Sequence, residues 1–234
     1  MRGWRNISGD WPGARRAHQL TDCCTPKGYR TIFSEKSAVG EARRYRRRGL
    51  DATSRRIFDF IKSRGVEGKT VLEVGGGIGA IEIELLKAGM ARAVNVELTP
   101  TYEAAAVGLL GESGLADRAE RKIMDFAEAG KEVESADVVV MNRVICCYPD
   151  MPKLAGAAAE HAKEVLVLSF PNERWWTQLG LSFANFGFGL FTIQFRVFLH
   201  APDRILAAVE QRGFKTTFNE RGFLWQVAAL ERVA

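Results

Sequence analysis

The feature that most constrains the fold is a short apolar strand that runs directly into a glycine-rich turn. Residues 71–74 precede Gly75, Gly77 and Gly79, and a helical pattern follows at once. Glycine has no Cβ, so the backbone can turn tightly and a ligand can approach the amides at the start of the helix closely. The stretch therefore predicts a nucleotide-cofactor loop, and by itself it does not say which nucleotide is bound.

Strand and helix patterns alternate on both sides of this loop. Apolar runs predict strands at 70–74, 93–98, 121–124, 136–141 and 165–169, and helical spacing predicts helices at 78–87, 99–110, 152–163 and 202–212. Two last strands, 214–218 and 223–230, are joined by only four residues and must form an antiparallel hairpin. We expect an α/β, doubly wound, seven-stranded sheet that is mostly parallel and ends in this hairpin.

The N-terminal part of the chain has a different composition. Residues 1–28 are rich in Gly, Pro and charge without periodicity, and we expect them to be disordered. Residues 29–66 are expected to form a helical cap, with helices at 35–48 and 51–62, and residues 67–234 the main domain with a hydrophobic insertion at about 174–200. A chain of 234 residues that is 47% hydrophobic can bury one such core.

Positive charge is concentrated near the N-terminus. Residues 1–60 hold 14 Lys and Arg against 6 Asp and Glu, and the run from Arg43 to Arg48 is the densest charge in the chain. This run fits a solvated helix face, or a clamp for an anionic substrate, a nucleic acid or acidic lipid head groups, and charge alone does not choose. The first twenty residues carry no apolar run of the secretory type, so we expect a cytoplasmic protein.

The four cysteines occur as two adjacent pairs, Cys23–Cys24 and Cys146–Cys147. This is the spacing neither of a disulfide framework nor of a zinc site, so reduced thiols are the simpler interpretation and no metal is predicted. A soft-metal or metalloid site would require the two pairs to meet in space.

Over residues 68–232 the sequence resembles the class I S-adenosylmethionine-dependent methyltransferases. Residues 73–79 match the E/D-x-G-x-G-x-G loop of that family at every fixed position, Glu97 stands at the end of the second strand and Asp125 at the end of the third, where the family places acidic residues. The segment 114–118 is also typical. The resemblance implies a Rossmann-like fold and S-adenosylmethionine as cofactor.

A dinucleotide enzyme is the rival interpretation. Gly75-x-Gly77-x-x-Ala80 also satisfies G-x-G-x-x-G/A, and Glu97 lies at about the expected distance for a ribose contact. The acid at Glu73, the Asp125 position, the closing hairpin and the lack of a second mononucleotide half favour the methyltransferase.

The resemblance implies a role for each matched residue. The loop amides would meet the methionine carboxylate of the cofactor, Glu97 would accept both ribose hydroxyls, and Asp125 would accept from the adenine amino group while Phe126 flanks the ring. The expected cofactor-binding residues are Glu73, Gly75, Gly76, Gly77, Gly79, Glu97, Leu98, Asp125, Phe126 and Asn142.

The end of the fourth strand bears on the methyl acceptor. Residues 142–149 contain neither the D/N-P-P-Y motif of amino-methylating nucleic-acid enzymes nor the Pro-Cys of cytosine-5 enzymes, so a nucleic acid is disfavoured and a small molecule gains support. A carboxylate acceptor needs no base, whereas a phenol or an amine does. The catalytic candidates are His200, Tyr148 and Arg143.

The insertion is the most unusual segment, since residues 175–195 contain no charge. Its length would admit a membrane span, but its Gln, Asn and Gly content favours a lid over an apolar pocket, with Phe188, Phe191, Phe195 and Phe198 at near-helical spacing. The expected substrate-binding residues are Tyr29, Phe33, Tyr45, Phe188 and Phe191. A weaker similarity to the magnesium-protoporphyrin O-methyltransferase-like group rests on the cap, Tyr148-Pro149 and this insertion.

These features predict methyl transfer to a small hydrophobic or aromatic acceptor, with O-methylation favoured. A cofactor-binding module without catalysis, which contacts a membrane or nucleic acid through the basic N-terminal region, is the alternative from another class. Metalloid methylation through the cysteine pairs is a third, more remote hypothesis. Peripheral membrane contact and the oligomeric state stay open.

Overall fold

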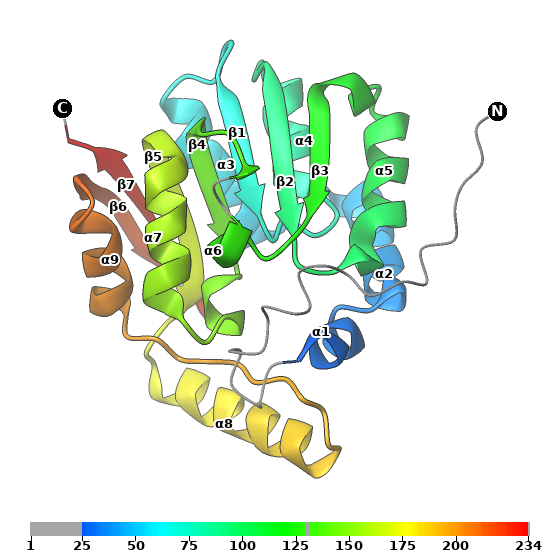
Figure 1. Cartoon of the computed structure of the whole chain (residues 1–234), viewed down its shortest axis with the longest axis vertical. Coiled ribbons are helices and arrows are strands. Elements are labelled where there is room, and N and C mark those ends of the chain that lie inside the picture. Colours follow the sequence, from blue (N-terminus) through cyan, green and yellow to red (C-terminus); the bar gives the residue numbers. More distant parts are fainter. Residues whose placement is uncertain (1–24, 130–131, 234) are drawn as a thin grey trace.

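The computed structural model describes residues 25–129 and 132–233, and in it a seven-stranded sheet is covered by helices on both faces (Figure 1). The strand order is β3-β2-β1-β4-β5-β7-β6. The first five strands pair in parallel and the last two are antiparallel, which confirms the predicted fold class. The strands are β1 (Thr70–Val74), β2 (Arg92–Glu97), β3 (Ala119–Ile123), β4 (Ala136–Asn142), β5 (Ala162–Pro171), β6 (Phe214–Arg221) and β7 (Trp225–Arg232).

Alternate residues of the central strands face two separate cores. Val71 and Val138 belong to the core on one side of the sheet, while Leu72 and Val139 belong to the core on the other. The first side is covered by α3 (Ala52–Ser63), α4 (Ala80–Lys87) and α5 (Glu103–Glu112), and the second by α7 (Met151–His161) and α9 (Pro202–Glu210). Short turns of helix, η3 (Pro100–Tyr102), η4 (Ala116–Arg118), α6 (Phe126–Ala129) and η6 (Ile145–Cys147), lie between these elements.

The cap consists of α1 (Pro26–Ile32), α2 (Glu35–Arg48) and α3. Thr25, Ser34 and Asp51 are the N-caps of these helices, and each side chain accepts a hydrogen bond from an amide of the first turn. The expectation of disorder through residue 28 was therefore wrong at its end, because Thr25 caps a helix that starts at Pro26. Residues 1–24, with Cys23 and Cys24, lie outside the described residues.

The insertion forms α8 (Trp175–Leu190), followed by an extended segment that leads to α9. The helix ends before Phe191, so the predicted helical face from Phe188 to Phe198 does not exist. Within the described parts of the chain, no helix is long and apolar enough to cross a membrane. Figure 1 shows α8 beneath the carboxyl ends of the strands, beside α1.

The extended segment after α8 packs directly on α1. Thr25 donates from its amide to the Gln194 carbonyl at 3.1 Å, and the rings of Tyr29 and Phe195 meet edge to face at 5.4 Å. A Cβ built on Gly28 would overlap the Gln194 carbonyl oxygen, so only glycine permits this approach of the two backbones.

Replacing Gly28 by alanine is expected to lower the free energy of unfolding by about 1–3 kcal/mol, because α1 must move away from the segment at Gln194. Gly40→Ala is the matched control, because Gly40 lies in α2 and nothing is within 4 Å of its added Cβ. This change is expected to raise the free energy of unfolding by about 0.5–1 kcal/mol. Thermal unfolding of both variants checks this. Equal stability of the two would contradict the close packing at Gly28.

Candidate functional site

The loop between β1 and α4 has the backbone geometry that glycine allows. Gly75, Gly77 and Gly79 all have left-handed φ values, of 65°, 60° and 74°. A Cβ on Gly75 would lie 2.6 Å from a methyl carbon of Val144, which follows β4. The glycine pattern is thus required both by the turn and by the close approach of the neighbouring strand end.

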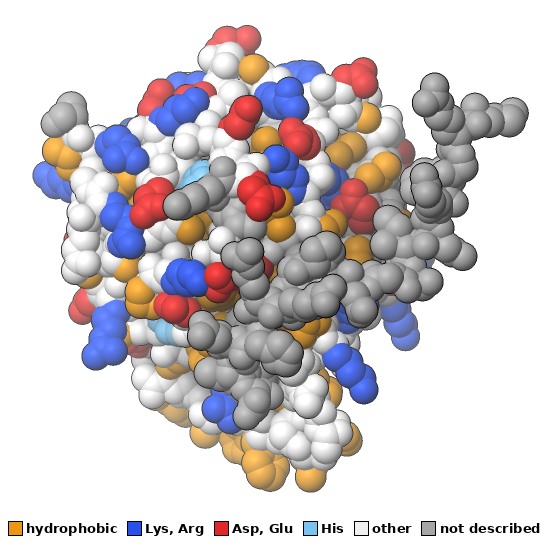
Figure 2. Space-filling view, in the orientation of Figure 1, with side chains coloured by type: hydrophobic (Ala, Val, Ile, Leu, Met, Phe, Trp, Pro, Cys, Tyr) orange, Lys and Arg blue, Asp and Glu red, His pale blue; other side chains and the backbone are white. Residues whose placement is uncertain are grey.

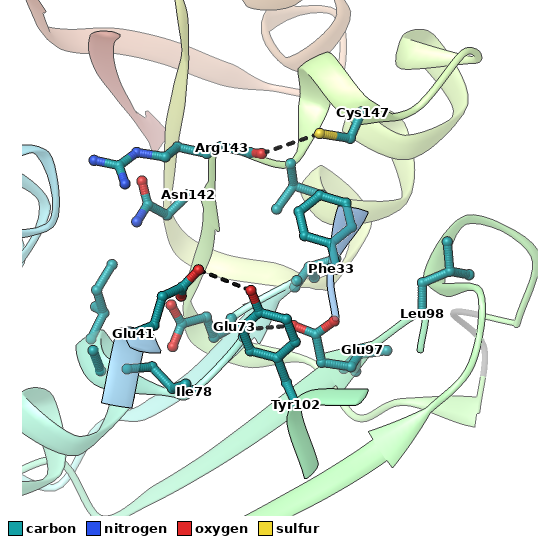
Figure 3. Close-up of a pocket in the computed structure, with 18 of the residues that line it drawn as sticks. Phe33, Glu41, Glu73, Ile78, Glu97, Leu98, Tyr102, Asn142, Arg143 and Cys147 are labelled. Atoms are coloured by element: carbon teal, nitrogen blue, oxygen red, sulfur yellow. Dashed lines mark hydrogen bonds between the residues drawn. The ribbon is translucent and has the colours of Figure 1, made fainter. Parts of the chain in front are cut away.

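The carboxyl ends of β1, β2, β3 and β4 surround one cavity of about 250 Å³ (Figure 3). This is the place where ligands bind in open parallel sheets. Of the predicted cofactor residues, nine line this cavity: Glu73, Gly75, Gly76, Gly77, Glu97, Leu98, Asp125, Phe126 and Asn142. Gly79 does not, because it is the N-cap of α4 and its amide donates within the turn to the Gly76 carbonyl at 2.9 Å.

Glu97 ends β2 with its carboxylate at the loop. Its Oε1 accepts a hydrogen bond from the Gly77 amide, and Figure 3 shows the side chain directed at Tyr102 and the loop. Burial raises the pKa of Glu97 to about 7, although the Gly77 bond and Arg121 oppose the shift. A carboxylate at this position can accept from two vicinal hydroxyls, which suits a ribose.

Glu41 and Tyr102 were not predicted, yet they form one side of the cavity. The Tyr102 hydroxyl donates to Glu41 Oε1 at 2.9 Å, which joins η3 to α2 of the cap. Burial and Glu41 raise the pKa of Tyr102, so the phenol stays protonated. Tyr102 could have been suspected from its place five residues after Glu97. Glu41 could not, because it belongs to no motif and lies just before the exposed arginines of the basic run.

A buried polar cluster supports the loop from below. Glu73 Oε2 accepts from the Glu82 amide at 3.2 Å, which ties the end of β1 to the first turn of α4. The Nη1 atom of Arg121 lies 3.6 Å from Oε1 of Glu82. The side chain of Asn95 lies so close to Gly76 that a Cβ at this position would overlap it. Burial raises the pKa of Glu73 well above its usual value and that of Glu82 to about 7. These contacts indicate that Glu73 positions the loop.

Asp125 and Tyr148 meet on the opposite side. The Tyr148 hydroxyl donates to Asp125 Oδ2 at 3.2 Å, and the amide of Ala127 donates to Oδ1 at 3.0 Å. Burial raises the pKa of both Asp125 and Tyr148. Tyr148 is therefore a neutral hydrogen-bond donor rather than a phenolate, which argues against its predicted use as a base.

Arg143 follows β4 in a left-handed conformation, with φ at 62°. Its amide donates to Ser169 Oγ at 2.9 Å, its guanidinium lies 2.7 Å from Asp51, and the same group stacks 5.1 Å from the ring of Trp225. A left-handed arginine costs about 1 kcal/mol, which these contacts offset. The residue thus links the sheet to the N-cap of α3 at the edge of the cavity.

Asn142, the last residue of β4, makes a second link of the same kind. Its side-chain amide donates to Ser54 Oγ at 3.1 Å and its oxygen accepts from Ser169 Oγ at 2.7 Å. The cap residues at positions 51 and 54 were not predicted, because no local pattern reveals a contact so distant in sequence.

The predicted substrate residues divide into two groups. Tyr29, Phe33 and Tyr45 line the cavity. Phe188 instead packs behind its wall, 5.6 Å from the ring of Phe195, and Phe191 is 73% exposed. Neither phenylalanine lines the cavity, since Phe188 lies on the side of α8 that packs on Phe195 and Phe191 follows the end of this helix at residue 190.

His200 lies outside the cavity as well. It lines a separate hollow with Pro149 and Met151, its ring stacks on Phe198, and its Nε2 is 3.1 Å from the Tyr148 carbonyl oxygen. Burial lowers its pKa. Its prediction as a catalytic residue gains no support from this position.

The cysteine pair at residues 146 and 147 lies beside the cavity. Cys147 lines it and Cys146 is buried, with the two Sγ atoms 3.7 Å apart. The part of the chain that the structure describes contains no group of three metal-ligating side chains. The metalloid hypothesis, which needs Cys23 and Cys24, therefore gains nothing from the described residues.

Comparisons with known proteins agree with this geometry. A family model described as a methyltransferase domain matches residues 41–223, well over half of the chain. Ribosomal protein L11 methyltransferase of Escherichia coli (strain SMS-3-5 / SECEC) is 34% identical over 95 residues, but the match covers only 40% of this chain and 31% of that protein. The chain thus spans about a third of the length of such relatives.

Solved structures show the same fold over more of the chain. Magnesium protoporphyrin IX methyltransferase from Synechocystis PCC 6803, solved with bound SAH, is similar over 87% of this chain and 99% of its own, with a TM-score of 0.66 and 19% identity. An O-methyltransferase family protein from Burkholderia thailandensis covers 87% of this chain and 64% of its own, with a TM-score of 0.62 and 20% identity.

The family match removes the dinucleotide enzyme as a rival, and the solved neighbours have the same overall fold. With the acidic residues of β2 and β3 at one cavity beside that loop, the chain belongs to the class I S-adenosylmethionine-dependent methyltransferases.

Proposed function

We propose that the protein transfers the methyl group of S-adenosylmethionine to a small apolar acceptor that carries an anionic oxygen. The observation that carries this proposal is one shared cavity, in which the glycine loop, Glu97 and Asp125 face an aromatic wall with an arginine at its edge. One side suits the cofactor and the other an apolar, negatively charged molecule.

The residues present fit the cofactor. Gly75 and Gly77 line the cavity without a side chain of their own, so a ligand can approach the loop backbone there. Glu97 presents a carboxylate for the ribose hydroxyls, and Asp125 can accept from the adenine amino group beside Phe126. When bound, the cofactor supplies an electrophilic methyl group on a sulfonium. The chain's own part is to hold the acceptor in line and to exclude water.

The acceptor side supports an oxygen nucleophile that is already ionised. Tyr29, Phe33 and Leu98 make this side apolar, and no histidine lines the cavity among the described residues. The hydroxyls of Tyr102 and Tyr148 are held protonated next to carboxylates. A carboxylate or an acidic enol needs no base, and the guanidinium of Arg143 can attract it.

The position of the basic run favours this reading over the nucleic-acid module. Arg44 and Tyr45 line the cavity, while Arg46 forms a two-pronged ion pair with Glu112 on α5. The run thus contributes to the cavity and to packing of the cap. Two structural neighbours, a magnesium protoporphyrin IX methyltransferase and an O-methyltransferase family 2 protein solved with apigenin, support an acceptor of this apolar kind.

A direct test combines cofactor binding with a matched panel of acceptors. We expect the purified protein to bind S-adenosylmethionine and to transfer its labelled methyl group to apolar carboxylic acids, but not to the corresponding primary amides, which have the same shape without the charge. Arg143→Gln should lower the rate with the acids, and Arg47→Gln, on the exposed part of the run, should leave it unchanged. Transfer to amines or RNA alone would contradict the proposed acceptor, and absence of cofactor binding would contradict the function itself.

A further inference from the structure

The outward face of α8 is apolar along its whole length. At about 100° per residue, its five large exposed residues fall within an arc of about 80°. They are Trp175, Leu179, Phe183, Phe186 and Leu190, each between 49% and 71% exposed. Figure 2 shows hydrophobic side chains gathered along the lower edge of the molecule, over α8. A soluble helix normally presents this kind of face to a core.

The inward face of the same helix is satisfied by contacts with the domain. Thr177 is buried and donates to the Asn172 side chain at 2.7 Å, and Phe188 packs on Phe195. The side chain of Asn185 both donates to the carbonyl and accepts from the amide of Val197, each at 2.8 Å. These contacts fix the rotation of α8 about its axis, so the apolar arc faces away from the domain.

The apolar surface continues beyond the helix at its N-terminal end. Phe223, in the turn between β6 and β7, is 79% exposed and stacks on Trp176 at 6.0 Å, and Leu224 beside it is 39% exposed. Within the described residues nothing covers this surface. Single exposed apolar residues are common, but a contiguous row of this size marks an interaction site.

Most of the charges around the row are basic. Between residues 173 and 196 the only charged residues are Glu173, Arg174 and Arg196. Lys27 and Arg30 are exposed on α1, which packs against the segment at Gln194. An uncharged Phe- and Leu-rich face with tryptophan at its end and arginines at its border has the composition of helices that lie in the interface of anionic membranes.

We propose that the face of α8, with Phe223, docks on the surface of an anionic lipid bilayer. A single convex helix suits a deformable lipid surface, and its 16 residues fit a helix that lies in the interface and does not span it. The inward side of α8 reaches the cavity through Phe195, which contacts Tyr29 and Phe33 of the cavity wall. Docking thus brings the apolar wall of the site next to the lipid phase.

The test is co-sedimentation of the full chain with vesicles of phosphatidylcholine and phosphatidylglycerol, and with vesicles of phosphatidylcholine alone. We expect binding to the mixed vesicles that weakens with salt, and binding to the neutral ones that is weaker still. The pair Phe183→Ser and Phe186→Ser should reduce partition into the mixed vesicles by at least about tenfold. Val39→Ser with Val107→Ser, at exposed positions on α2 and α5, is the matched control and should bind as the unchanged protein does.

Two results would overturn the proposal. One is partition that is the same in the serine pair and in the control. The other is a protein that does not bind vesicles but forms a dimer that the serine pair dissociates, since the occupant would then be a second copy. Cofactor binding is measured in the same samples without vesicles, so failure of membrane docking is distinguished from failure of the proposed methyl transfer.

Discussion

Replacing Glu97 by alanine is expected to weaken S-adenosylmethionine binding by at least about a hundredfold, which isothermal titration calorimetry can measure. Two hydrogen bonds from ribose hydroxyls to a carboxylate contribute about 1.5–3 kcal/mol each, and each 1.4 kcal/mol is a factor of ten. The same change also frees the Gly77 amide, which now donates to Glu97. Glu112→Ala removes an exposed carboxylate paired with Arg46 and is the control, with affinity unchanged. Full affinity in the Glu97 variant would refute the site assignment.

The same residue makes the affinity depend on pH. The pKa of Glu97 is raised to about 7 by burial, and only its ionised form accepts both hydroxyl hydrogen bonds. We therefore expect the affinity to rise by up to about tenfold per pH unit below 7 and to level off above it. Glu97→Gln should bind weakly with a flat profile over this range. A slope that persists in that variant would assign the titration to a buried neighbour, such as Glu73 or Glu82.

Stability should have the opposite dependence on pH. A carboxyl whose pKa is raised by folding contributes most to stability below its ordinary pKa, and this contribution is lost as pH rises through the raised value. Glu73, Glu82 and Glu97 are all shifted upward by burial, the last two to about 7. The free protein is thus less stable in the pH range in which it binds the cofactor most tightly. This is expected of a site whose carboxylates are buried and lack the hydrogen bonds that a ligand would donate.

The grouping of the residues that we assign to the cofactor could be predicted from the sequence because local rules determine it. Parallel strands bring their carboxyl ends to one edge of the sheet, so residues that end successive strands, such as Glu97 and Asp125, must lie near the loop. At positions 75 and 77 the residue type itself indicates the left-handed backbone conformation that glycine allows. The glycine motif and the strand-end carboxylates therefore predict the same location for the site.

The acceptor half could be predicted only in part: Tyr29, Phe33 and Tyr45 line the cavity, but the contacts made by the docked cap could not be predicted. Glu41 faces the cavity because α2 packs on η3, and the guanidinium of Arg143 is held by Asp51 from another helix. Neither contact has a sequence pattern, since both depend on how the cap docks on the sheet. Phe191 was expected on a helical face because the spacing of aromatics continues past residue 190, but the helix does not. His200 was expected at the cavity from its place before the last helix, and its side chain lines a separate hollow instead.

Replacing Gly77 by aspartate is expected to abolish measurable cofactor binding while the domain stays folded. Gly77 has φ at 60°, and a Cβ there would lie 3.3 Å from the ring of Tyr102 and 4.0 Å from a Glu41 oxygen. The new carboxylate would stand beside Glu41 and Glu97, where the loop has to receive the carboxylate of the cofactor. Repulsion between like charges in a partly buried cavity adds to the steric obstruction.

Gly114→Asp separates this effect from backbone strain. Gly114 has φ at 66°, close to that of Gly77, but nothing lies within 4 Å of its added Cβ. Both variants carry about the same cost of a left-handed aspartate, on the order of 1 kcal/mol, which corresponds to a loss of about 2–4 °C in Tm for a chain of this size. Gly114→Asp should therefore melt slightly earlier and bind S-adenosylmethionine normally, while Gly77→Asp should lose binding. If both lost affinity equally, the cause would be strain in the fold, and the loop would no longer be identified as the cofactor site.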